Sequence, residues 1–229
     1  MRIDIMTLFP DTMNAIMHES ILGRAAKKGI IEINCVQIRD YTENKQCQVD
    51  DYPYGGGWGC VMMAQPLKSC LDDIMSTMQG KRSRVIYMSP QGKPYDQATA
   101  RRLKNDYDHL VLVCGHYEGI DERFIEQCVD EEISLGDFVL TGGELAAAVM
   151  ADSITRLIPG VLSDEQSALS DSFQDNLLAA PVYTRPADYK GWKVPDILLS
   201  GHDAKIKEWE MTQSLERTKR LRPDLLKKK

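Results

Sequence analysis

The sequence predicts an α/β protein built on a mainly parallel sheet, followed by a small helical C-terminal part. Two unbroken apolar runs, 85–88 and 110–114, have the composition of strands that are covered on both faces. Segments with helical periodicity lie between such runs, and strands that alternate with helices favour a parallel sheet. The length of 229 residues suits a core of about 150 residues with an appendage.

The N-terminal segments already follow this alternation. Ile3 to Leu8 alternates apolar and polar residues, as a half-buried strand does. Pro10 and Asp11 then open one helix, which runs through Leu22 and ends at Gly29. Residues 31–35 alternate again and predict a second strand.

The central segments continue the pattern after a polar, Gly-rich stretch over 40–59 that is too long for a simple connection. Pro66 begins a helix whose apolar residues, spaced three and four apart up to Met78, form one continuous face. A strand over 85–88 ends at Ser89-Pro90-Gln91-Gly92, a helix is expected over 96–104, and the strand 110–114 ends at Gly115.

The C-terminal segments are predicted to be helical. A helix rich in small residues covers 144–156, whereas 158–186 has few periodic signals and is expected to be a loop. Residues 195–229 are expected to be helical, with Ile206, Trp209 and Leu215 as packing anchors. The expected domains are a cofactor-binding α/β domain over 1–160, a linker over 161–186 and a helical domain over 187–229.

Charge is distributed unevenly along the chain. The net charge is −6, yet residues 185–229 hold 12 basic and 7 acidic side chains. A basic tail on an acidic body favours a polyanionic partner, and a solvated helical tail explains the charge equally well.

Several classes of protein are disfavoured by composition. No apolar run approaches the ~18 residues of a membrane span, and the N-terminus lacks the pattern of a signal peptide, so a cytoplasmic protein is expected. The six cysteines form no CxxC and no zinc pattern, so we expect reduced thiols and no metal site.

Three segments have the composition of a ligand-binding sheet edge: 87–92, 114–119 and 134–143. Each places Gly or Pro just past or inside an apolar run, and ligands of open α/β sheets bind at the carboxyl ends of the strands. A shared small-molecule pocket is therefore expected. The Gly-rich segment 51–59 lacks the strand-to-helix context of a dinucleotide site and is either a structural turn or a loop that contacts a nucleobase.

Two charged residues are candidates for chemistry. Asp171 lies in the irregular segment and is either a turn or helix-capping carboxylate or a general base. Arg156, near the end of the small-residue helix, can neutralise an oxyanion. No histidine is assigned a catalytic role.

Read together, these segments resemble the bacterial tRNA (guanine-N1)-methyltransferase family of the SPOUT superfamily. The resemblance spans nearly the whole chain, and many long motifs in order are more specific than any one of them. The motifs are VDDYPYGGGWG (49–59), IYMSPQGKPYDQ (86–97), LVCGHYEGIDER (112–123), SLGDFVLTGGEL (134–145), SFQDNLLAAPVYTRP (172–186) and VPDILLSGH (194–202).

The resemblance implies a C-terminal trefoil knot in the α/β domain, a homodimer with active sites at the subunit interface, and S-adenosyl-L-methionine bound in the knot. It implies methyl transfer to N1 of guanosine 37 of tRNA, with Asp171 as general base and Arg156 stabilising the charge on O6. The implied cofactor residues are Tyr87, Met88, Ser89, Pro90, Gly115, Tyr117, Glu118, Ser134, Leu135, Gly136, Asp137, Phe138, Val139, Leu140, Gly142 and Gly143.

The implied tRNA contacts are Asp50, Gly56, Gly57 and Gly59, together with the C-terminal domain. Four positions depart from the family pattern: Gln46 for His, Ala146 for Pro, Asn176 for Gly and Ala179 for Asp. Gln46 and Ala179 lie at positions linked to tRNA handling. A SPOUT enzyme with another RNA target and a non-enzymatic RNA-binding protein therefore remain the alternatives.

Overall fold

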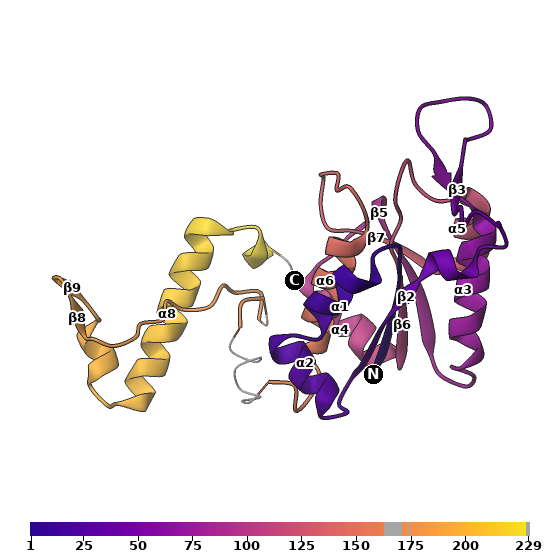
Figure 1. Cartoon of the computed structure of the whole chain (residues 1–229). Coiled ribbons are helices and arrows are strands. Elements are labelled where there is room, and N and C mark those ends of the chain that lie inside the picture. The colour runs from indigo at the N-terminus through magenta and orange to yellow at the C-terminus, as the bar shows by residue number, and fades with distance from the viewer. Residues whose placement is uncertain (163–170, 174, 228–229) are drawn as a thin grey trace. The chain divides into compact units, whose positions relative to one another are not determined.

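A five-stranded sheet forms the centre of the first of two units of the chain (Figure 1). The computed structural model describes residues 1–162, 171–173 and 175–227, and the two units are Met1–Ser163 and Asp164–Lys229. All neighbouring strands are parallel, which confirms the predicted α/β class. In spatial order the strands are β2 (Glu32–Gln37), β1 (Arg2–Thr7), β6 (His109–Val113), β5 (Ser83–Pro94) and β7 (Glu131–Ser134).

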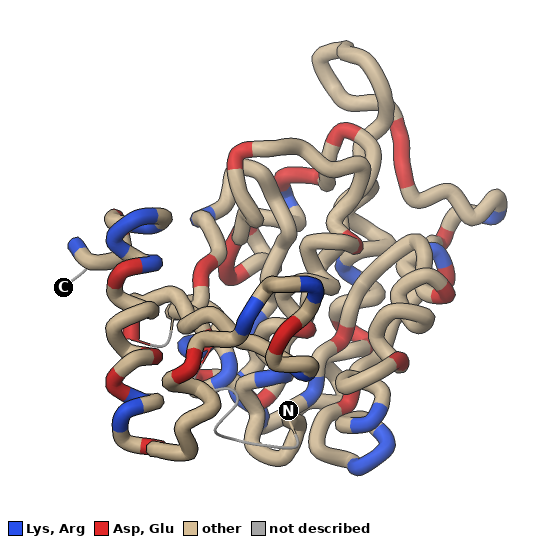
Figure 2. The backbone as a smooth tube through the Cα atoms, turned by 90° about the vertical axis from the view of Figure 1, so that its left-hand side faces the viewer, with Lys and Arg blue, Asp and Glu red and all other residues tan. Residues whose placement is uncertain are grey.

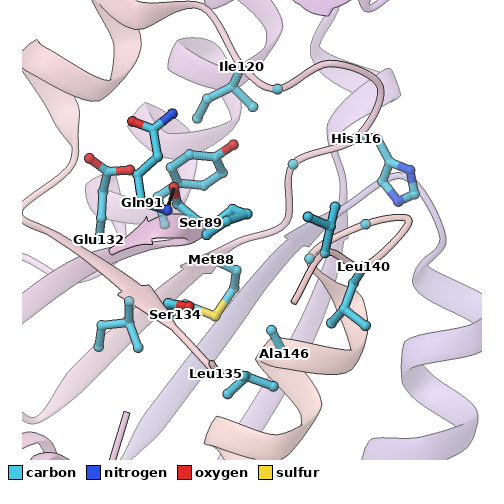
Figure 3. A pocket seen from close by; sticks show the side chains of 18 of the residues that line it. Met88, Ser89, Gln91, His116, Ile120, Glu132, Ser134, Leu135, Leu140 and Ala146 are labelled. Atoms are coloured by element: carbon cyan, nitrogen blue, oxygen red, sulfur yellow. Dashed lines mark hydrogen bonds between the residues drawn. The ribbon is translucent and has the colours of Figure 1, made fainter. Parts of the chain in front are cut away.

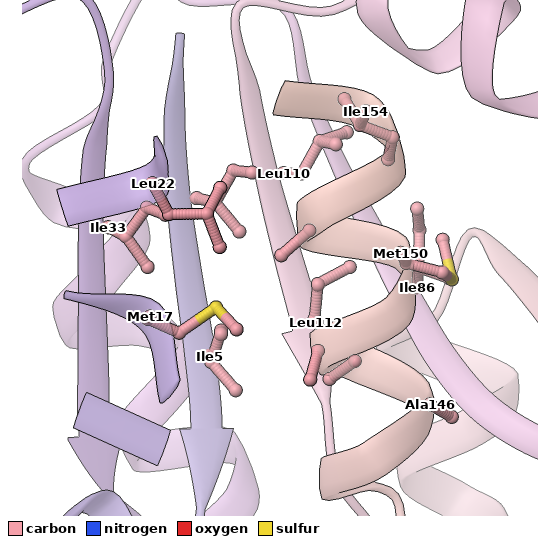
Figure 4. Packing of buried hydrophobic residues seen from close by; sticks show 14 of the residues in the cluster. Ile5, Met17, Leu22, Ile33, Ile86, Leu110, Leu112, Ala146, Met150 and Ile154 are labelled. Atoms are coloured by element: carbon pink, nitrogen blue, oxygen red, sulfur yellow. The ribbon is translucent and has the colours of Figure 1, made fainter. Parts of the chain in front are cut away.

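Helices cover both faces of this sheet, and each face has its own apolar core. In Figure 4, Met17, Leu22 and Met150 point from the helices toward the sheet residues of one face. The helices on this face are α1 (Pro10–Met17), α2 (Ser20–Lys27), α4 (Gln97–Asp106) and α6 (Glu144–Thr155). The helices on the other face are α3 (Ala64–Ser76) and α5 (Glu122–Cys128). In the described ranges, no helix combines the length and apolarity needed to cross a membrane.

The single helix expected from Pro10 onward is wrong, because the chain breaks between α1 and α2. Met17 and Leu22 both reach the core of the same face. In one continuous helix their side chains would point about 140° apart. A turn in which Ser20 adopts a φ of 52° redirects the second helix, so both apolar faces meet the sheet.

Strand β5 continues past Ser89, where the sequence predicted its end. The pairing of β5 with β7 shifts in register between Met88 and Lys93. Gly92 allows this irregularity, because a Cβ there would collide with the backbone of Glu132. Helix α5 was not predicted. It is only seven residues long and buries a single residue, Phe124, which is too little for a periodic signal.

The Gly-rich stretch forms a small hairpin. Ile38–Tyr41 is a 3-10 turn (η1), and strands β3 (Asp50–Asp51) and β4 (Val61–Met62) pair antiparallel. Met62 N donates to Gly119 O at 3.0 Å, which fastens the hairpin to the loop after β6. In Figure 2 the loop between β3 and β4 projects without a charged residue along its tip.

The second unit is built around a long helix, α8 (Asp203–Leu221). Of the three expected anchors, Ile206 and Trp209 are partly buried, whereas Leu215 is 37% exposed and was wrongly predicted. Thr218 is buried instead, and its hydroxyl accepts a hydrogen bond from Leu178 N at 2.9 Å. The other elements are the hairpin β8 (Asp188–Tyr189) and β9 (Trp192–Lys193), which was not predicted, and the 3-10 turns η2 (Asp196–Leu199) and η3 (Leu225–Lys227).

The segment 158–186 was expected to be a loop. Residues 163–170 and 174 lie outside the described residues, and the described remainder contains no helix or strand.

Candidate functional site

A cavity of about 400 Å³ opens at the carboxyl ends of β6 and β7, beside residues 87–91 of β5 (Figure 3). All three segments predicted from the sequence line it, because the carboxyl ends of parallel strands meet at one edge of the sheet. The predicted residues that it brings together are Tyr87, Met88, Ser89, Pro90, Gly115, Tyr117, Glu118, Ser134, Leu135, Phe138, Val139, Leu140, Gly142 and Gly143.

Two predicted cofactor residues, Gly136 and Asp137, lie in the same loop but do not line the cavity. Gly136 shapes the loop instead. Its φ is 153°, its N–H donates to Ser134 Oγ at 3.1 Å, and a Cβ there would lie 2.9 Å from the Phe138 ring. The glycine therefore turns the chain so that Phe138 can face the cavity.

The cavity walls are backbones that approach one another closely. A Cβ at Gly115 would lie 2.9 Å from the Tyr87 ring, and a Cβ at Gly143 would lie 2.7 Å from Cys114 Cα. Gly143 N donates to Gly115 O at 3.0 Å, so the chain that leaves β7 lies against the end of β6. Any side chain at these two glycines would separate the loops.

Ten further residues line the cavity wall without having been assigned individually, although Gln91, His116, Gly119 and Thr141 belong to the three segments that the sequence predicted. Glu132 was within reach of prediction, because side chains alternate along a strand and Ser134, two residues later, faces the cavity. The remainder depends on loop paths that a sequence pattern does not encode. The ten residues are Gln91, His116, Gly119, Ile120, Glu122, Ile125, Glu132, Ile133, Thr141 and Ala146.

The cavity has an acidic character. Glu118, Glu122 and Glu132 line it, and its described wall contains neither lysine nor arginine. Burial, and then the charges of Glu132 and Glu122, raise the pKa of Tyr87 to about 12. Tyr87 therefore stays neutral, and the surrounding carboxylates favour a ligand that carries positive charge.

The predicted RNA-contacting residues lie on the hairpin beside this cavity. Asp50 is in β3, and Gly56, Gly57 and Gly59 lie in the exposed loop to β4. The loop is joined to the cavity wall at its base, where Glu118 N donates to Cys60 O at 3.0 Å. A Cβ at Gly59 would lie 2.7 Å from the Glu118 side chain, so this glycine allows the close approach.

Comparison with known proteins identifies the family of this chain. The family model described as tRNA (Guanine-1)-methyltransferase TrmD matches residues 1–228. The chain belongs to this methyltransferase family. A tRNA (guanine-N(1)-)-methyltransferase of Bacteroides thetaiotaomicron is 59% identical over 226 residues, covering 99% of both chains. One of Ruminiclostridium cellulolyticum is 56% identical over 228 residues, covering 100% of this chain and 97% of the relative.

As a member of the methyltransferase family the protein is an enzyme, and its two candidate catalytic residues lie in different units. Arg156 follows α6 as its C-terminal cap, and its N–H donates to Asp152 O at 3.1 Å. Asp171 belongs to the second unit, where it is partly buried.

The four departures from the methyltransferase family pattern fall at distinct places. Ala146 lines the cavity, and Gln46 is exposed in the stretch before β3. Asn176 has a φ of 57°, a conformation that Gly and Asn adopt most readily, which explains why Asn can replace Gly there. Ala179 binds through its backbone: its N–H donates to Ser172 Oγ and its carbonyl accepts from Arg217.

Proposed function

We propose that the protein transfers a methyl group from S-adenosylmethionine to N1 of guanosine at position 37 of tRNA. The observation that carries the proposal is the cavity beside β5 at the ends of β6 and β7, in a chain that matches the methyltransferase family over residues 1–228. The names of the relatives indicate that the substrate is tRNA and that the methylated atom is N1 of guanine.

The residues of the cavity fit S-adenosylmethionine. Its purine and its aliphatic carbons need an apolar surface, which Leu135, Leu140 and Ile133 offer. Its sulfonium and ammonium groups are cationic, and Glu118, Glu122 and Glu132 line the same space. The glycines at positions 115 and 143 allow the loops of the wall to approach one another closely.

The chemistry needs one base and one stabilised oxyanion. When bound, S-adenosylmethionine supplies an electrophilic methyl carbon. Guanine N1 carries a proton, so it becomes a good nucleophile only when a base removes that proton. Asp171 accepts the proton, which contributes roughly 10²–10⁴-fold to the rate. Arg156 stabilises the negative charge that develops on O6, and the loss of such a donor costs roughly 10²–10³-fold.

We infer a trefoil knot at the cofactor site. The sheet order puts β5 between β6 and β7, yet the chain after β7 returns to the end of β6, where Gly143 N meets Gly115 O. The segment 134–143 therefore runs past β5 and reaches the loop that follows β6. Such a crossing supports the threading that defines a knot, a rare exception among folds.

We also infer a homodimer in which Asp171 acts beside the cofactor of the other subunit. The exposed side of α6 supports a partner: Leu145 and Val149, one turn apart, are 58% and 48% exposed. Two neighbouring apolar side chains exposed on one side of a helix suit a subunit contact. In a twofold dimer the same surface is used by both copies.

Recognition of the RNA is assigned to the loop between β3 and β4 and to the C-terminal unit. Tyr54 and Trp58 on that loop are almost fully exposed, and exposed aromatic rings stack with unpaired bases. Guanine in an anticodon loop must leave its stack to reach a cavity. Asp50 lies in β3 at the base of the loop, Gly59 lies against Glu118 of the cavity wall, and Gly56 and Gly57 lie farther out on the same loop.

The decisive experiment incubates the purified chain with methyl-labelled S-adenosylmethionine and a tRNA transcript that has guanosine at position 37. Labelled 1-methylguanosine, identified by mass spectrometry of the nucleosides, is the expected product. A transcript with adenosine at that position is the matched control and should remain unlabelled. Label in a different nucleoside would assign the enzyme another target, and no label in any RNA would contradict the proposal.

A further inference from the structure

The hairpin β8–β9 in the second unit is exposed along both strands. Its two-residue loop has positive φ at both positions, 53° at Lys190 and 89° at Gly191, as in a type I′ turn. Gly191 N donates to Asp188 Oδ1 at 2.7 Å, which holds the turn closed. A short hairpin with this turn presents its side chains in a fixed arrangement before any partner binds.

One face of the hairpin is an exposed aromatic pair. Tyr189 and Trp192 are directly opposed across the strands, their ring centroids are 5.9 Å apart, and the rings are tilted by 58°. They are 52% and 77% exposed. Lys190 Nζ lies 5.6 Å from the centroid of the Tyr189 ring, so a positive charge accompanies the pair.

The charges around the pair favour a polyanionic partner over an apolar protein surface. Arg185, Lys190 and Lys193 bring three positive charges to residues 185–193, against the single carboxylate of Asp188. That carboxylate is engaged in the turn. Aromatic rings that stack with bases, next to cations that meet phosphates, are the combination used for single-stranded nucleic acid.

We propose that the β8–β9 hairpin is a separate RNA contact of this protein. An unpaired base stacks on Trp192 and Tyr189, and Lys190 faces a neighbouring phosphate. The identity of the RNA rests on the proposed function, whereas the stacking contact does not depend on methyl transfer. The hairpin therefore contributes to RNA affinity and leaves the cofactor cavity unaffected.

The alternation of side chains on the hairpin supplies a matched control. Lys190 accompanies the aromatic pair, whereas Lys193 pairs across the strands with Asp188 and so lies on the opposite face. The two lysines have the same charge and lie three residues apart. Met211, 60% exposed on α8, is a control for the loss of an exposed apolar side chain.

The test uses the full chain and measures its equilibrium binding to a fluorescein-labelled tRNA transcript by anisotropy. We expect Trp192→Ala to weaken RNA binding about 5- to 100-fold, and Trp192→Phe to retain most of the affinity because the ring remains. Lys190→Gln should lower the slope of log Kd against log salt by about 0.7 to 0.9. Lys193→Gln should change the slope less than Lys190→Gln does, because Lys193 lies on the face opposite the aromatic pair, and Met211→Ala should leave affinity and slope close to those of the unmodified chain.

Two further measurements keep the outcome decisive. Calorimetric titration with S-adenosylmethionine should give the same affinity for Trp192→Ala as for the unmodified chain, and sedimentation should give the same mass. Unchanged RNA binding by Trp192→Ala would overturn the inference, as would a smaller sedimenting species, which would assign this face to a subunit contact. If the variant loses RNA affinity but the unmodified chain methylates no RNA, the hairpin contact stands and the proposed function fails.

Discussion

His116 Nε2 lies 2.8 Å from Glu144 Oε2, so one hydrogen bond joins the loop after β6 to the first turn of α6. The other oxygen of Glu144 accepts a hydrogen bond from Thr7 Oγ1 at 2.7 Å, which extends the connection to the end of β1. Gly142 packs against the imidazole, and a Cβ there would collide with it. The network therefore holds together the two neighbouring loops of the cavity wall that carry His116 and Leu140 (Figure 3).

Removal of the Glu144 carboxylate should loosen these loops. We expect Glu144→Ala to lower the free energy of unfolding by about 1 to 3 kcal/mol, because Thr7 and His116 lose a shared, partly buried acceptor. Cofactor affinity, measured by calorimetric titration, should fall as well. Glu126→Ala removes an exposed helical glutamate and is the matched control. Equal cofactor affinity in the two variants would show that the network does not hold the cavity.

Gly143→Ala should disrupt the crossing at the end of β6. The φ of Gly143 is −78°, so alanine is compatible with the backbone, but its Cβ would lie 2.7 Å from Cys114 Cα and 3.1 Å from Gly115 N. The obstacle is backbone rather than a flexible side chain, so urea denaturation should give a loss of about 1 to 3 kcal/mol.

The control for this variant is Gly55→Ala, in the loop between β3 and β4. A Cβ there would meet nothing within 4 Å, but φ is 85°. It should cost only the backbone penalty of about 1 to 2 kcal/mol and leave cofactor binding unchanged. Cofactor binding by Gly143→Ala at full affinity would be inconsistent with the close crossing.

The sheet and the cavity could be predicted from the sequence because buried strands have a distinct, apolar composition. Residues 110–114 are apolar without interruption, since β6 is covered on both faces. Parallel strands end at one edge, so the three Gly-containing segments had to meet. The prediction of cavity residues therefore succeeded for most residues of these three segments, and failed for Gly136 and Asp137.

The failures share a different cause. The break between Met17 and Leu22 and the register shift near Gly92 depend on what those residues contact in three dimensions. His116 was not assigned a role because its partner, Glu144, is 28 residues away in the sequence. Helix α5 buries one side chain, so its sequence shows no helical periodicity. Local pattern does not contain such long-range contacts.

Asp4 should make stability depend on acidic pH. Burial favours its neutral form, but hydrogen bonds from His109, Arg2 and Asn34 outweigh burial and lower the pKa of this carboxyl. A lowered folded-state pKa stabilises the fold above the unfolded-state value of about 3.9, and this stabilisation is lost as pH falls through the folded-state pKa.

Urea denaturation between about pH 3 and about pH 7 measures this dependence. The free energy of unfolding should fall below about pH 4, and Asp4→Asn should flatten the curve while lowering it by about 1 to 3 kcal/mol near neutrality. Asp11→Asn, which removes an exposed carboxylate, should keep the original slope. If the free energy of unfolding of Asp4→Asn depends on pH as steeply as that of the unmodified protein, Asp4 is not the source of the pH dependence.

Leu145→Asp tests the subunit interface inferred from α6. A charge in the centre of an apolar contact should favour separate subunits, so sedimentation should give about half the mass of the unmodified protein. Methyl transfer should fall with the dimer, because the inferred site needs both subunits. Leu199→Asp places the same charge on an exposed leucine of the second unit and should alter neither quantity. If Leu145→Asp sediments as a dimer of unchanged mass, the subunit interface does not include this side of α6.

Asp171 and Arg156 should affect turnover rather than cofactor binding. If Asp171 removes the N1 proton, Asp171→Ala lowers kcat roughly 10²–10⁴-fold. Arg156→Ala should lower it roughly 10²–10³-fold. Because both residues act in the transition state, the affinity for S-adenosylmethionine should be unchanged in each variant.

Asp175→Ala is the matched control for the base, since it removes an exposed carboxylate four residues along the same segment. It should turn over at nearly the unmodified rate, which separates proton removal from a general loss of negative charge. Single-turnover rates with tRNA at saturation exclude effects on binding. If Asp171→Ala raises KM for tRNA and leaves kcat unchanged, the carboxylate contributes to RNA binding. Another group would then have to accept the N1 proton.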